Sequence, residues 1–466
     1  MTDLRSASVA ETVRLTSEGD LTPRVVVDEA LDRIASLDPG LNAFSVVLAE
    51  RAHEEAVALG QGRDTTGPLH GVPIAIKEEV DVAGCVTTFG GEANTTPAAA
   101  DAELVARLRA AGAVIVGKTT MPEFGAYPYT EGASRGITRN PWDPTRTPGG
   151  SSGGTAAAVA SGMVPVGIGG DGGGSIRIPS AMCGLFGLKP QRGRVTTAPH
   201  EHLWWALGTV GPLARTVRDA AIVYDVIKGN TDIDLYRAGP TGSFEAAALR
   251  EPGRLRIGWS VKPVGVGVRP DPLHVAAVEE TARLLTTLGH DVREVDPRYP
   301  DPTAAFVPQF FAGIRSEAQA VEHYDRLERR TRETYRLGSW VTPKVTQWAL
   351  RASERVSTRA NRVFDDVDVL LTPSIAHRPP RVGVIDGRGT VASSLLAMPA
   401  IAYAALWNVA GNPAASVPCG LAPDGLPVGV QLVGPTDGEE VLLSLSAQLE
   451  QARPWPLLAG ASGVTD

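Results

Sequence analysis

The chain has 466 residues, of which 43% are hydrophobic and 21% charged, as expected for a globular protein that buries a large core. A net charge of −8 argues against nucleic acid or an acidic membrane surface as its main partner. Its three cysteines have no CxxC spacing, which predicts neither a disulfide framework nor a zinc site and favours a reducing, cytoplasmic compartment.

The first 60 residues are expected to be helical. Thr22–Pro23 is a typical helix start with proline at the first helical position, and apolar residues follow at helical spacing. The sequence Asp38-Pro39-Gly40 is expected to end this helix.

Strands and helices then alternate, and this pattern predicts an α/β sheet with helices on its faces. Strands are expected at 73–76, 113–117, 164–168, 255–259, 366–374, 412–420 and 426–434. Helices are expected at 101–111, 155–163, 211–229, 272–289, 313–365 and 438–451, and a loop at 121–148. No linker divides the chain.

Two nucleotide-binding sequence patterns occur in the chain, but neither has the flanking secondary structure that the motif requires. Residues 112–119 fit a P-loop, but a helix precedes them and their interior AVIV is strand-forming, so Lys118 is predicted to be structural. Residues 167–172 fit GxGxxG, but Ser175-Ile-Arg-Ile-Pro179 stands where the dinucleotide fold opens a helix. Neither pattern predicts a bound nucleotide.

A third pattern leaves an alternative open. Residues 149–153 fit the GxSxG turn of α/β-hydrolases, although a proline-rich loop stands where that turn needs a strand. Asp368 and His377 lie downstream and supply the acid and the histidine that such an enzyme needs. A serine esterase of this type is therefore the alternative from outside the favoured class.

Glycine is concentrated at residues 149–175, where 11 of the chain's 51 glycines occur within 27 residues. The first cluster presents Ser151 and Ser152, and the second presents Ser175. Glycine lets backbone N–H groups approach a ligand without interference from Cβ atoms. This stretch is therefore the predicted site, with Gly172, Gly173 and Gly174 offering N–H groups to an oxyanion.

A lysine completes the predicted chemistry without histidine. Only six of the 44 basic residues are lysine, and Lys77 ends the strand-like PIAI segment. A serine hydroxyl needs a base, and an amine in apolar surroundings is able to act as one. Two serines allow a relay in which Ser151 passes the proton of Ser175 to Lys77. Glu78 and Glu79 would oppose this if they faced the amine.

These residues resemble the amidase signature family over almost the whole chain, from about residue 10 to 455. The resemblance is carried by GVPIAIK (71–77), GKTTMPEFG (117–125), TRNPWDPTRTPGGSSGGTAAAVA (138–160), DGGGSIRIPSAMCGLFGLKPQRGRV (171–195) and GPLARTVRDAA (211–221). It implies that Lys77 is the base, that Ser151 is the relay residue on a non-proline cis peptide, and that Ser175 is the acylated nucleophile. Ser152, Asp171 and Arg177 are expected to support them.

The family fold implied is a single large α/β/α sandwich around a mixed, mostly parallel sheet. One amidase domain is expected over 1–466, with helices at about 1–60, the signature core at about 70–225, and a substrate-pocket and C-terminal part at about 226–466. Two departures stand out: Glu78-Glu79 replaces the usual Asp-Asn after the lysine, and Gly172 replaces a threonine.

The expected activity is hydrolysis of C–N acyl bonds in small amides or carbamates, without metal or cofactor. The segment TRNPW…SSGG looks most like bacterial amidases acting on nylon-type amides, aryl acylamides or urethanes. Trp204 and Trp205 are the predicted pocket residues, with His200, His202, Phe310, Phe311, Trp340 and Trp407 as further candidates. No nucleic acid or membrane partner is expected, and the resemblance favours a monomer or homodimer. The alternative within the family is the glutamine-hydrolysing subunit of a tRNA amidotransferase.

Overall fold

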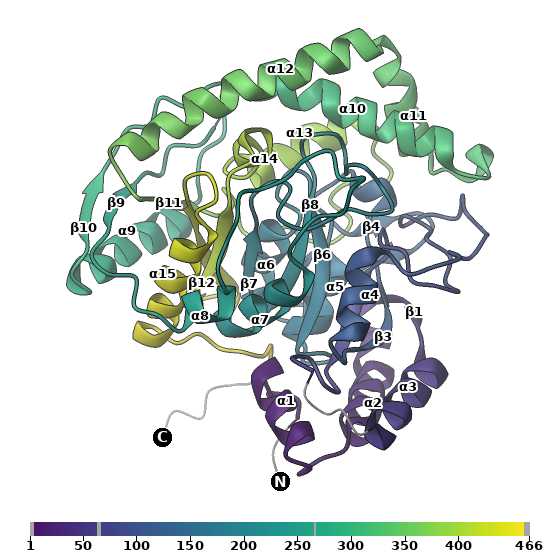
Figure 1. Ribbon diagram of the computed structural model, residues 1–466. Helices are drawn as coiled ribbons and strands as arrows, with labels where there is room; N and C mark the ends of the chain where they lie inside the picture. Colours follow the sequence, from purple (N-terminus) through teal and green to yellow (C-terminus); the bar gives the residue numbers. More distant parts are fainter. Residues whose placement is uncertain (1–3, 63–66, 265–266, 461–466) are drawn as a thin grey trace.

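A single twisted sheet forms the centre of the computed structural model, which describes residues 4–62, 67–264 and 267–460 (Figure 1). Its eleven strands lie in the order β1-β3-β2-β6-β8-β7-β12-β13-β11-β9-β10, and β4 and β5 form a separate two-stranded sheet. The ends of the predicted domain, residues 1–3 and 461–466, lie outside the described residues.

The strands are β1 (Phe44–Val47), β2 (Pro73–Lys77), β3 (Val114–Thr119), β4 (Glu131–Gly132), β5 (Gly136–Ile137), β6 (Val166–Asp171), β7 (Phe186–Lys189), β8 (Thr209–Ala214), β9 (Arg256–Trp259), β10 (Asp291–Glu294), β11 (Val369–Pro373), β12 (Ala414–Leu421) and β13 (Pro427–Val433). The helices are α1 (Val9–Ser17), α2 (Pro23–Leu41), α3 (Ala49–Gln61), α4 (Glu103–Ala110), α5 (Gly153–Ala160), α6 (Arg177–Cys183), α7 (Val217–Ile227), α8 (Phe244–Ala248), α9 (Pro272–Thr287), α10 (Thr303–Ala320), α11 (Arg329–Leu337), α12 (Pro343–Ala360), α13 (Thr390–Ile401), α14 (Ala405–Ala410) and α15 (Glu439–Ala452).

Side chains alternate along the central strands and build a core on each face of the sheet. Ile74 and Ile76 of β2 pack into the cluster that includes α4, α7, α9 and α15. Ala75, which points the opposite way, packs into the cluster with α2, α3 and α5. This two-residue period is the pattern expected of a strand covered on both faces. The predicted α/β fold with helices around a mixed sheet is confirmed.

The direction of the strands corrects one detail of the prediction. Within the described sheet, four neighbouring pairs are parallel and six are antiparallel. The sheet is therefore mixed but not mostly parallel. Strands β12 and β13 are joined by a short turn, and such a connection allows only an antiparallel pair. Parallel pairing is confined to β3-β2-β6 and to β11-β9-β10.

Several predicted elements are wrong. The first 60 residues, predicted to be helical, include strand β1, which pairs with β3 at the edge of the sheet. Helix α2 continues through Pro39 to Leu41 and ends where Asn42 adopts the left-handed conformation, at φ 54°. The segment predicted as one helix at 211–229 is two elements, because residues 211–214 pair with β6 and the helix begins at Val217. Thr216 caps that helix by accepting from the backbone N–H of Asp219 at 3.1 Å.

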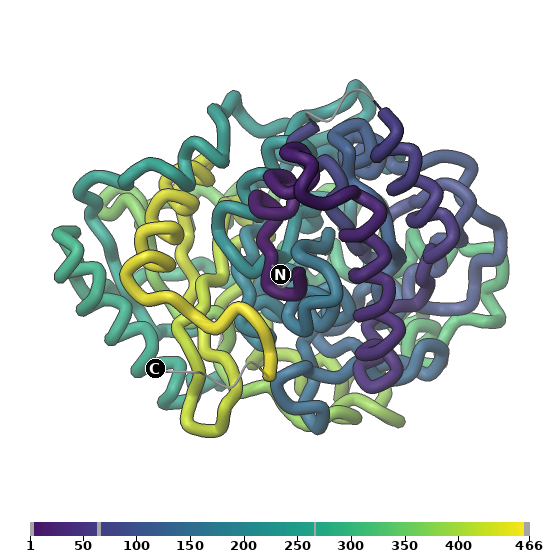
Figure 2. The backbone as a smooth tube through the Cα atoms, turned by 90° about the horizontal axis from the view of Figure 1, so that it is seen from below, coloured from purple at the N-terminus to yellow at the C-terminus, as the bar shows by residue number. Residues whose placement is uncertain are grey.

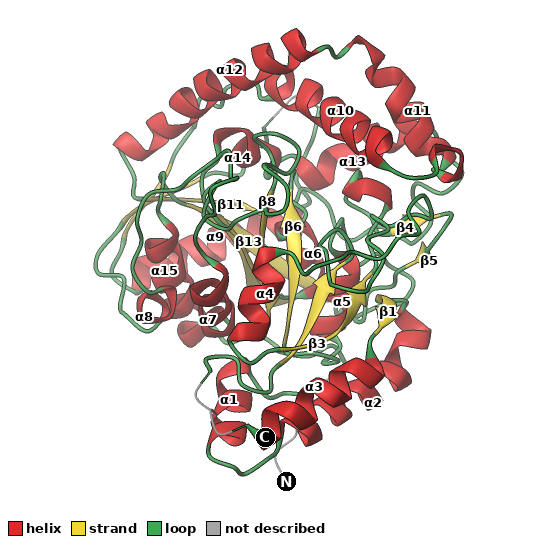
Figure 3. Cartoon of the chain, turned by 45° about the vertical axis from the view of Figure 1, so that its right-hand side comes forward, coloured by secondary structure: helices red, strands yellow, loops and turns green. Residues whose placement is uncertain are grey.

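Helices α10 to α13 form a layer across one end of the sheet (Figure 3). The stretch 313–365, predicted as helix, contains the end of α10, which begins earlier at Thr303, and then α11 and α12 as separate helices. Helix α13 spans residues 390–401. At the other end of the molecule the chain's two terminal segments meet, with Arg5 Nη2 donating to the carbonyl of Ala459 at 3.1 Å (Figure 2). Within the described ranges, no helix is both long and apolar enough to cross a bilayer.

Candidate active site

The site lies at the carboxyl ends of two adjacent strands. β2 and β6 run parallel and pair from Ile74 to Ile76, and they end at Lys77 and Asp171. Because parallel strands end at the same edge of a sheet, the lysine and the second glycine cluster are brought together there, as in other open α/β sheets. The first cluster enters from the loop before α5.

The amine of Lys77 is buried, with the residue 1% exposed, and it donates a hydrogen bond to Ser151 Oγ at 2.8 Å. Its second neighbour is Glu79, whose Oε1 lies 3.1 Å from Nζ. Glu78 points elsewhere, toward Arg135 and Thr88. Of the two acids that replace the family's Asp-Asn, one therefore faces the amine and the other does not.

Ser151 follows a cis peptide bond from Gly150, as the resemblance implies. The backbone of Gly150 is packed so closely that a Cβ there would lie 2.7 Å from the backbone nitrogen of Tyr129. The next residue, Ser152, is buried and joins the two clusters: its Oγ donates to the carbonyl of Gly170 at 3.2 Å, and its N–H donates to that of Ser175 at 3.4 Å. Ser152 thus contacts the loop and not the amine.

Asp171 organises the loop that carries Ser175. It accepts from the backbone N–H groups of Gly174 (2.7 Å) and Ile176 (3.2 Å) and from both Nε and Nη2 of Arg177 (3.0 Å each). Both side chains are fully buried. Burial alone would raise the pKa of Asp171, but the guanidinium and the amide of Asn408 hold the pKa well below its usual value. The carboxylate therefore stays ionised as a brace for the loop.

The three glycines predicted to face an oxyanion differ in their hydrogen bonds. The N–H of Gly174 is already bound to Asp171. In the part of the chain that the structure describes, the N–H groups of Gly172, Gly173 and Ser175 have no acceptor. A Cβ at Gly172 would lie 3.3 Å from the Trp204 ring, so this departure from the family's threonine makes room for the indole.

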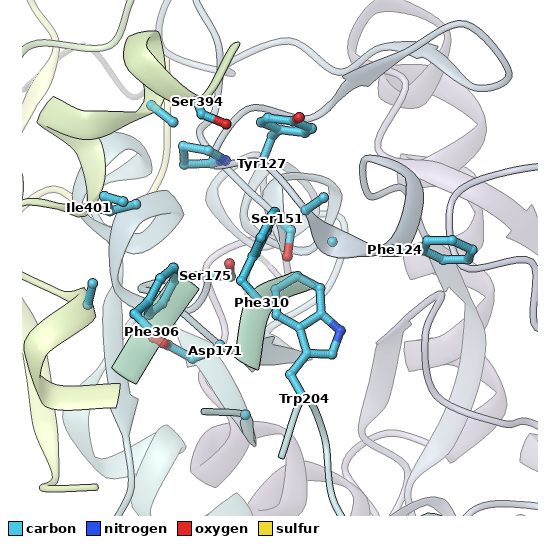
Figure 4. A pocket seen from close by; sticks show the side chains of 18 of the residues that line it. Phe124, Tyr127, Ser151, Asp171, Ser175, Trp204, Phe306, Phe310, Ser394 and Ile401 are labelled. Atoms are coloured by element: carbon cyan, nitrogen blue, oxygen red, sulfur yellow. The ribbon is translucent and has the colours of Figure 1, made fainter. Parts of the chain in front are cut away.

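A cavity of about 470 Å³ opens over Lys77, Ser151 and Ser175. Its walls are mainly aromatic and aliphatic, as is usual for a small-molecule site. Figure 4 shows the rings of Trp204, Phe306 and Phe310 around the two serines. Trp204 meets Phe310 edge to face, with ring centroids 5.5 Å apart. Helix α13 adds an aliphatic wall that includes Leu395 and Ile401.

Some of the predicted pocket residues line this cavity and others do not. Trp204, Phe310 and Phe311 are in the lining, whereas Trp205, His200, His202, Trp340 and Trp407 are not among the described lining residues. The Trp205 ring instead stacks on His202, with centroids 4.5 Å apart, and Trp407 is a core residue. Sequence reasoning missed Tyr127, Phe306 and Glu317, which no local motif marks, and also Phe124, which lies in the GKTTMPEFG segment but is not among the predicted pocket residues.

The alternative motifs do not form sites. Lys118 is buried and donates to Thr87 Oγ1 at 3.1 Å, as a structural lysine would. Most of the GxGxxG segment lies inside β6, where no loop is present to hold a phosphate. Asp368 binds Arg256 at 2.7 Å, and His377 Nε2 is 2.9 Å from Tyr129 Oη. The acid and histidine of an α/β-hydrolase are therefore not assembled at Ser151.

The site combines a buried lysine, hydrogen-bonded to one serine, with a second serine on a glycine-rich loop. This arrangement agrees with the family resemblance of the whole chain. The chain belongs to the amidase family, whose model matches residues 25–443. The relative AmiB2 of Mycobacterium tuberculosis is 50% identical over 459 residues, covering 97% of this chain and 98% of its own. A solved structure of 6-aminohexanoate cyclic dimer hydrolase is 31% identical with a TM-score of 0.90, covering 98% of both chains. A bacterial aryl acylamidase structure is 29% identical with a TM-score of 0.87, covering 97% of this chain and 98% of its own.

Proposed function

We propose that the protein hydrolyses the C–N acyl bond of small amides, including aryl amides or carbamates, through an acyl-enzyme on Ser175. The observation that carries the proposal is the 2.8 Å hydrogen bond between Lys77 Nζ and Ser151 Oγ at the floor of the cavity that Ser175 also lines. A general base must lie within hydrogen-bond distance of the proton that it takes.

In the proposed first step, the amine of Lys77 accepts the proton of Ser151 while Ser151 accepts that of Ser175. Ser175 Oγ then bonds to the carbonyl carbon, and the carbonyl oxygen becomes an oxyanion. We propose that it is bound by the N–H groups of Gly172 and Gly173, which have no acceptor among the described residues, whereas the N–H of Gly174 donates to Asp171. Glu79 balances the positive charge that Lys77 gains.

The second step reverses the proton path. The C–N bond breaks as Ser151 returns a proton to the leaving nitrogen, which departs as an amine. Water then attacks the ester on Ser175 with the same groups acting as base, and a carboxylate is released. The chain supplies every proton acceptor that these steps use.

The test is a panel of matched aryl amides, carbamates and esters, assayed with the full chain and with Ser175→Ala. Turnover of an amide by the chain alone, lost in the variant, is the expected result. An isolated chain that hydrolyses glutamine only when tRNA amidotransferase subunits are added would instead support the alternative within the family. Gel filtration of the active sample tests the expected monomer or homodimer.

We also propose that residues 1–466 act as one domain in a reducing, cytoplasmic compartment. The single large sheet takes its strands from Phe44 to Val433, and the three cysteines are free.

A further inference from the structure

The cavity contains more negative charge than the proposed hydrolysis requires. Its acidic lining residues are Glu79, Asp171, Asp301 and Glu317. Asp171 is paired with Arg177, and Asp301 lies exposed and accepts from the N–H of Thr303 at 2.9 Å. Glu79 and Glu317 remain, with Lys77 as the basic residue in the described lining.

Glu79 is held close to the reacting groups. Its Oε1 pairs with Lys77 Nζ at 3.1 Å, and its side chain is 17% exposed. It lies against the backbone of Gly170, where a Cβ would overlap the carboxylate. Only Asp171 separates this contact point from the glycines before Ser175, so a group bound at Glu79 would be a short distance from Ser175.

Glu317 approaches from helix α10, the wall opposite the sheet. It stands beside Ile314 and Ala318, which pack with Phe124 and Leu327 in an apolar cluster. Among the described residues its carboxyl group has no hydrogen-bond or ion-pair partner. Burial, with a further contribution from the charge of Glu79, raises the pKa of Glu317 to about 7.

A carboxylate without a partner in apolar surroundings is costly, and a second one nearby adds repulsion. Glu79 has the amine of Lys77 as its partner, whereas no basic side chain in the described lining contacts Glu317. A ligand cation placed between them would satisfy both the missing hydrogen bonds and the missing charge, and it would do so where the low dielectric makes the attraction strong. A primary ammonium fits this need, because it is compact and has three N–H donors.

We propose that Glu317 and Glu79 bind a protonated amino group of the substrate, so that the preferred substrates are amides carrying a primary ammonium on an apolar arm. This inference rests on the proposed amide hydrolysis. The arm lies along the aromatic wall of Trp204, Phe306 and Phe310, and it joins the ammonium at the carboxylates to the scissile bond at Ser175.

The test compares two substrates of nearly equal shape, the 4-nitroanilides of 5-aminopentanoic acid and of hexanoic acid, at pH 8. The expected kcat/KM is about tenfold or more higher for the cationic anilide, since a hydrogen-bonded charge pair contributes that much. Glu317→Gln keeps the shape of the side chain and removes the charge, so it is expected to reduce this ratio about tenfold. Glu280→Gln, on the exposed side of α9, is the matched control and should leave the ratio unchanged.

Competition by pentylammonium and by 1-pentanol gives a second readout. The cation is expected to inhibit at concentrations about tenfold or more below those of the alcohol, and Glu317→Gln should remove the difference. A wild-type enzyme that hydrolyses the neutral anilide equally well would overturn the cation site and leave the proposed function standing. Equal losses on both anilides in Glu317→Gln would also overturn it, because they would place the carboxyl in the catalytic step.

If the wild-type chain hydrolyses neither anilide and no other amide, the proposed function fails, and binding alone decides the inference. Calorimetry on Ser175→Ala with pentylammonium and 1-pentanol is then the readout. Tighter binding of the cation that depends on Glu317 supports the site, and equal binding of the two refutes it.

Discussion

The pair formed by Asp171 and Arg177 allows the sharpest test of how the loop that carries the proposed nucleophile, Ser175, is held. Both side chains are fully buried, and Asp171 accepts hydrogen bonds from the backbone at Gly174 and Ile176. Arg177→Met fills a similar volume but leaves the carboxylate without its counter-charge. Removing one partner of a buried ion pair costs about 3–5 kcal/mol.

That cost converts into a measurable shift. With an entropy of unfolding of about 2 cal/mol/K per residue, a chain of this length is expected to lose roughly 3–5 °C in Tm. The same variant should lose most of its kcat, because the loop that carries Ser175 is released. Differential scanning fluorimetry and the aryl amide assay measure the two effects on one sample.

Two further variants test whether the fall in Tm comes from the lost charge pairing or from lost packing. Arg177→Lys keeps the charge but loses the two-pronged contact, so its Tm should fall less than that of Arg177→Met. Adding Asp171→Asn to Arg177→Met removes the unpaired charge, and the double variant should regain at least half of the lost Tm. If the double variant is instead less stable than Arg177→Met, packing and not charge holds the loop, and the reasoning is refuted.

The remaining predictions concern the base, the first glycine cluster and pH. Lys77→Met should lower kcat on the order of 10²–10⁴-fold. Lys118→Met, which removes a buried lysine outside the cavity, should lower Tm but leave the folded protein active. Equal activity losses in the two variants would contradict the proposal that Lys77 is the base. Gly150→Ala should lower both activity and Tm, because its Cβ would lie 2.7 Å from a backbone nitrogen, while Gly40→Ala, with nothing within 4 Å, should change neither. Burial, with the charge of Asp219, raises the pKa of Glu450 to about 7, above its ordinary 4.5. The stabilisation by Glu450 is therefore complete below about pH 4.5 and is lost as the pH rises through 7. The fall in Tm from pH 5 to pH 8 should be smaller by about 2 °C in Glu450→Gln than in the wild type. An equal fall in both proteins would refute this prediction.

Local sequence patterns were sufficient to predict the elements that carry the catalytic candidates. Apolar residues before Lys77 and around Val166 predicted strands that are present, and glycine marked both serine-bearing loops. The same patterns could not reveal strand direction, because a strand's side-chain alternation is the same in parallel and antiparallel pairs. The segment 211–214 adjoins a strongly helical stretch, and the sequence therefore predicts it as helix. In the structure it belongs to a central strand.

The cavity lining was predicted less completely than the catalytic floor. Trp204 is predicted because it follows the second glycine cluster, whereas Phe306 and Glu317 lie far from both clusters and follow no motif. Phe124 lies in the GKTTMPEFG segment, but that motif does not indicate where its ring points. Trp205 shows the limit of such reasoning, since its ring turns to His202 although its neighbour lines the cavity. The sequence also left open which acid after Lys77 would face the amine, because that depends on where β2 ends and on the absence of a side chain at Gly170.

The layer formed by α10 to α13 has a consequence for how such an enzyme diversifies. The groups proposed to transfer protons come from residues 77–175, whereas much of the cavity lining above them comes from residues 301–405. Exchange of the later segment between relatives would therefore change which molecules are admitted while leaving the machinery beneath intact, and chimaeras joined outside residues 301–405 offer a direct route to altered selectivity.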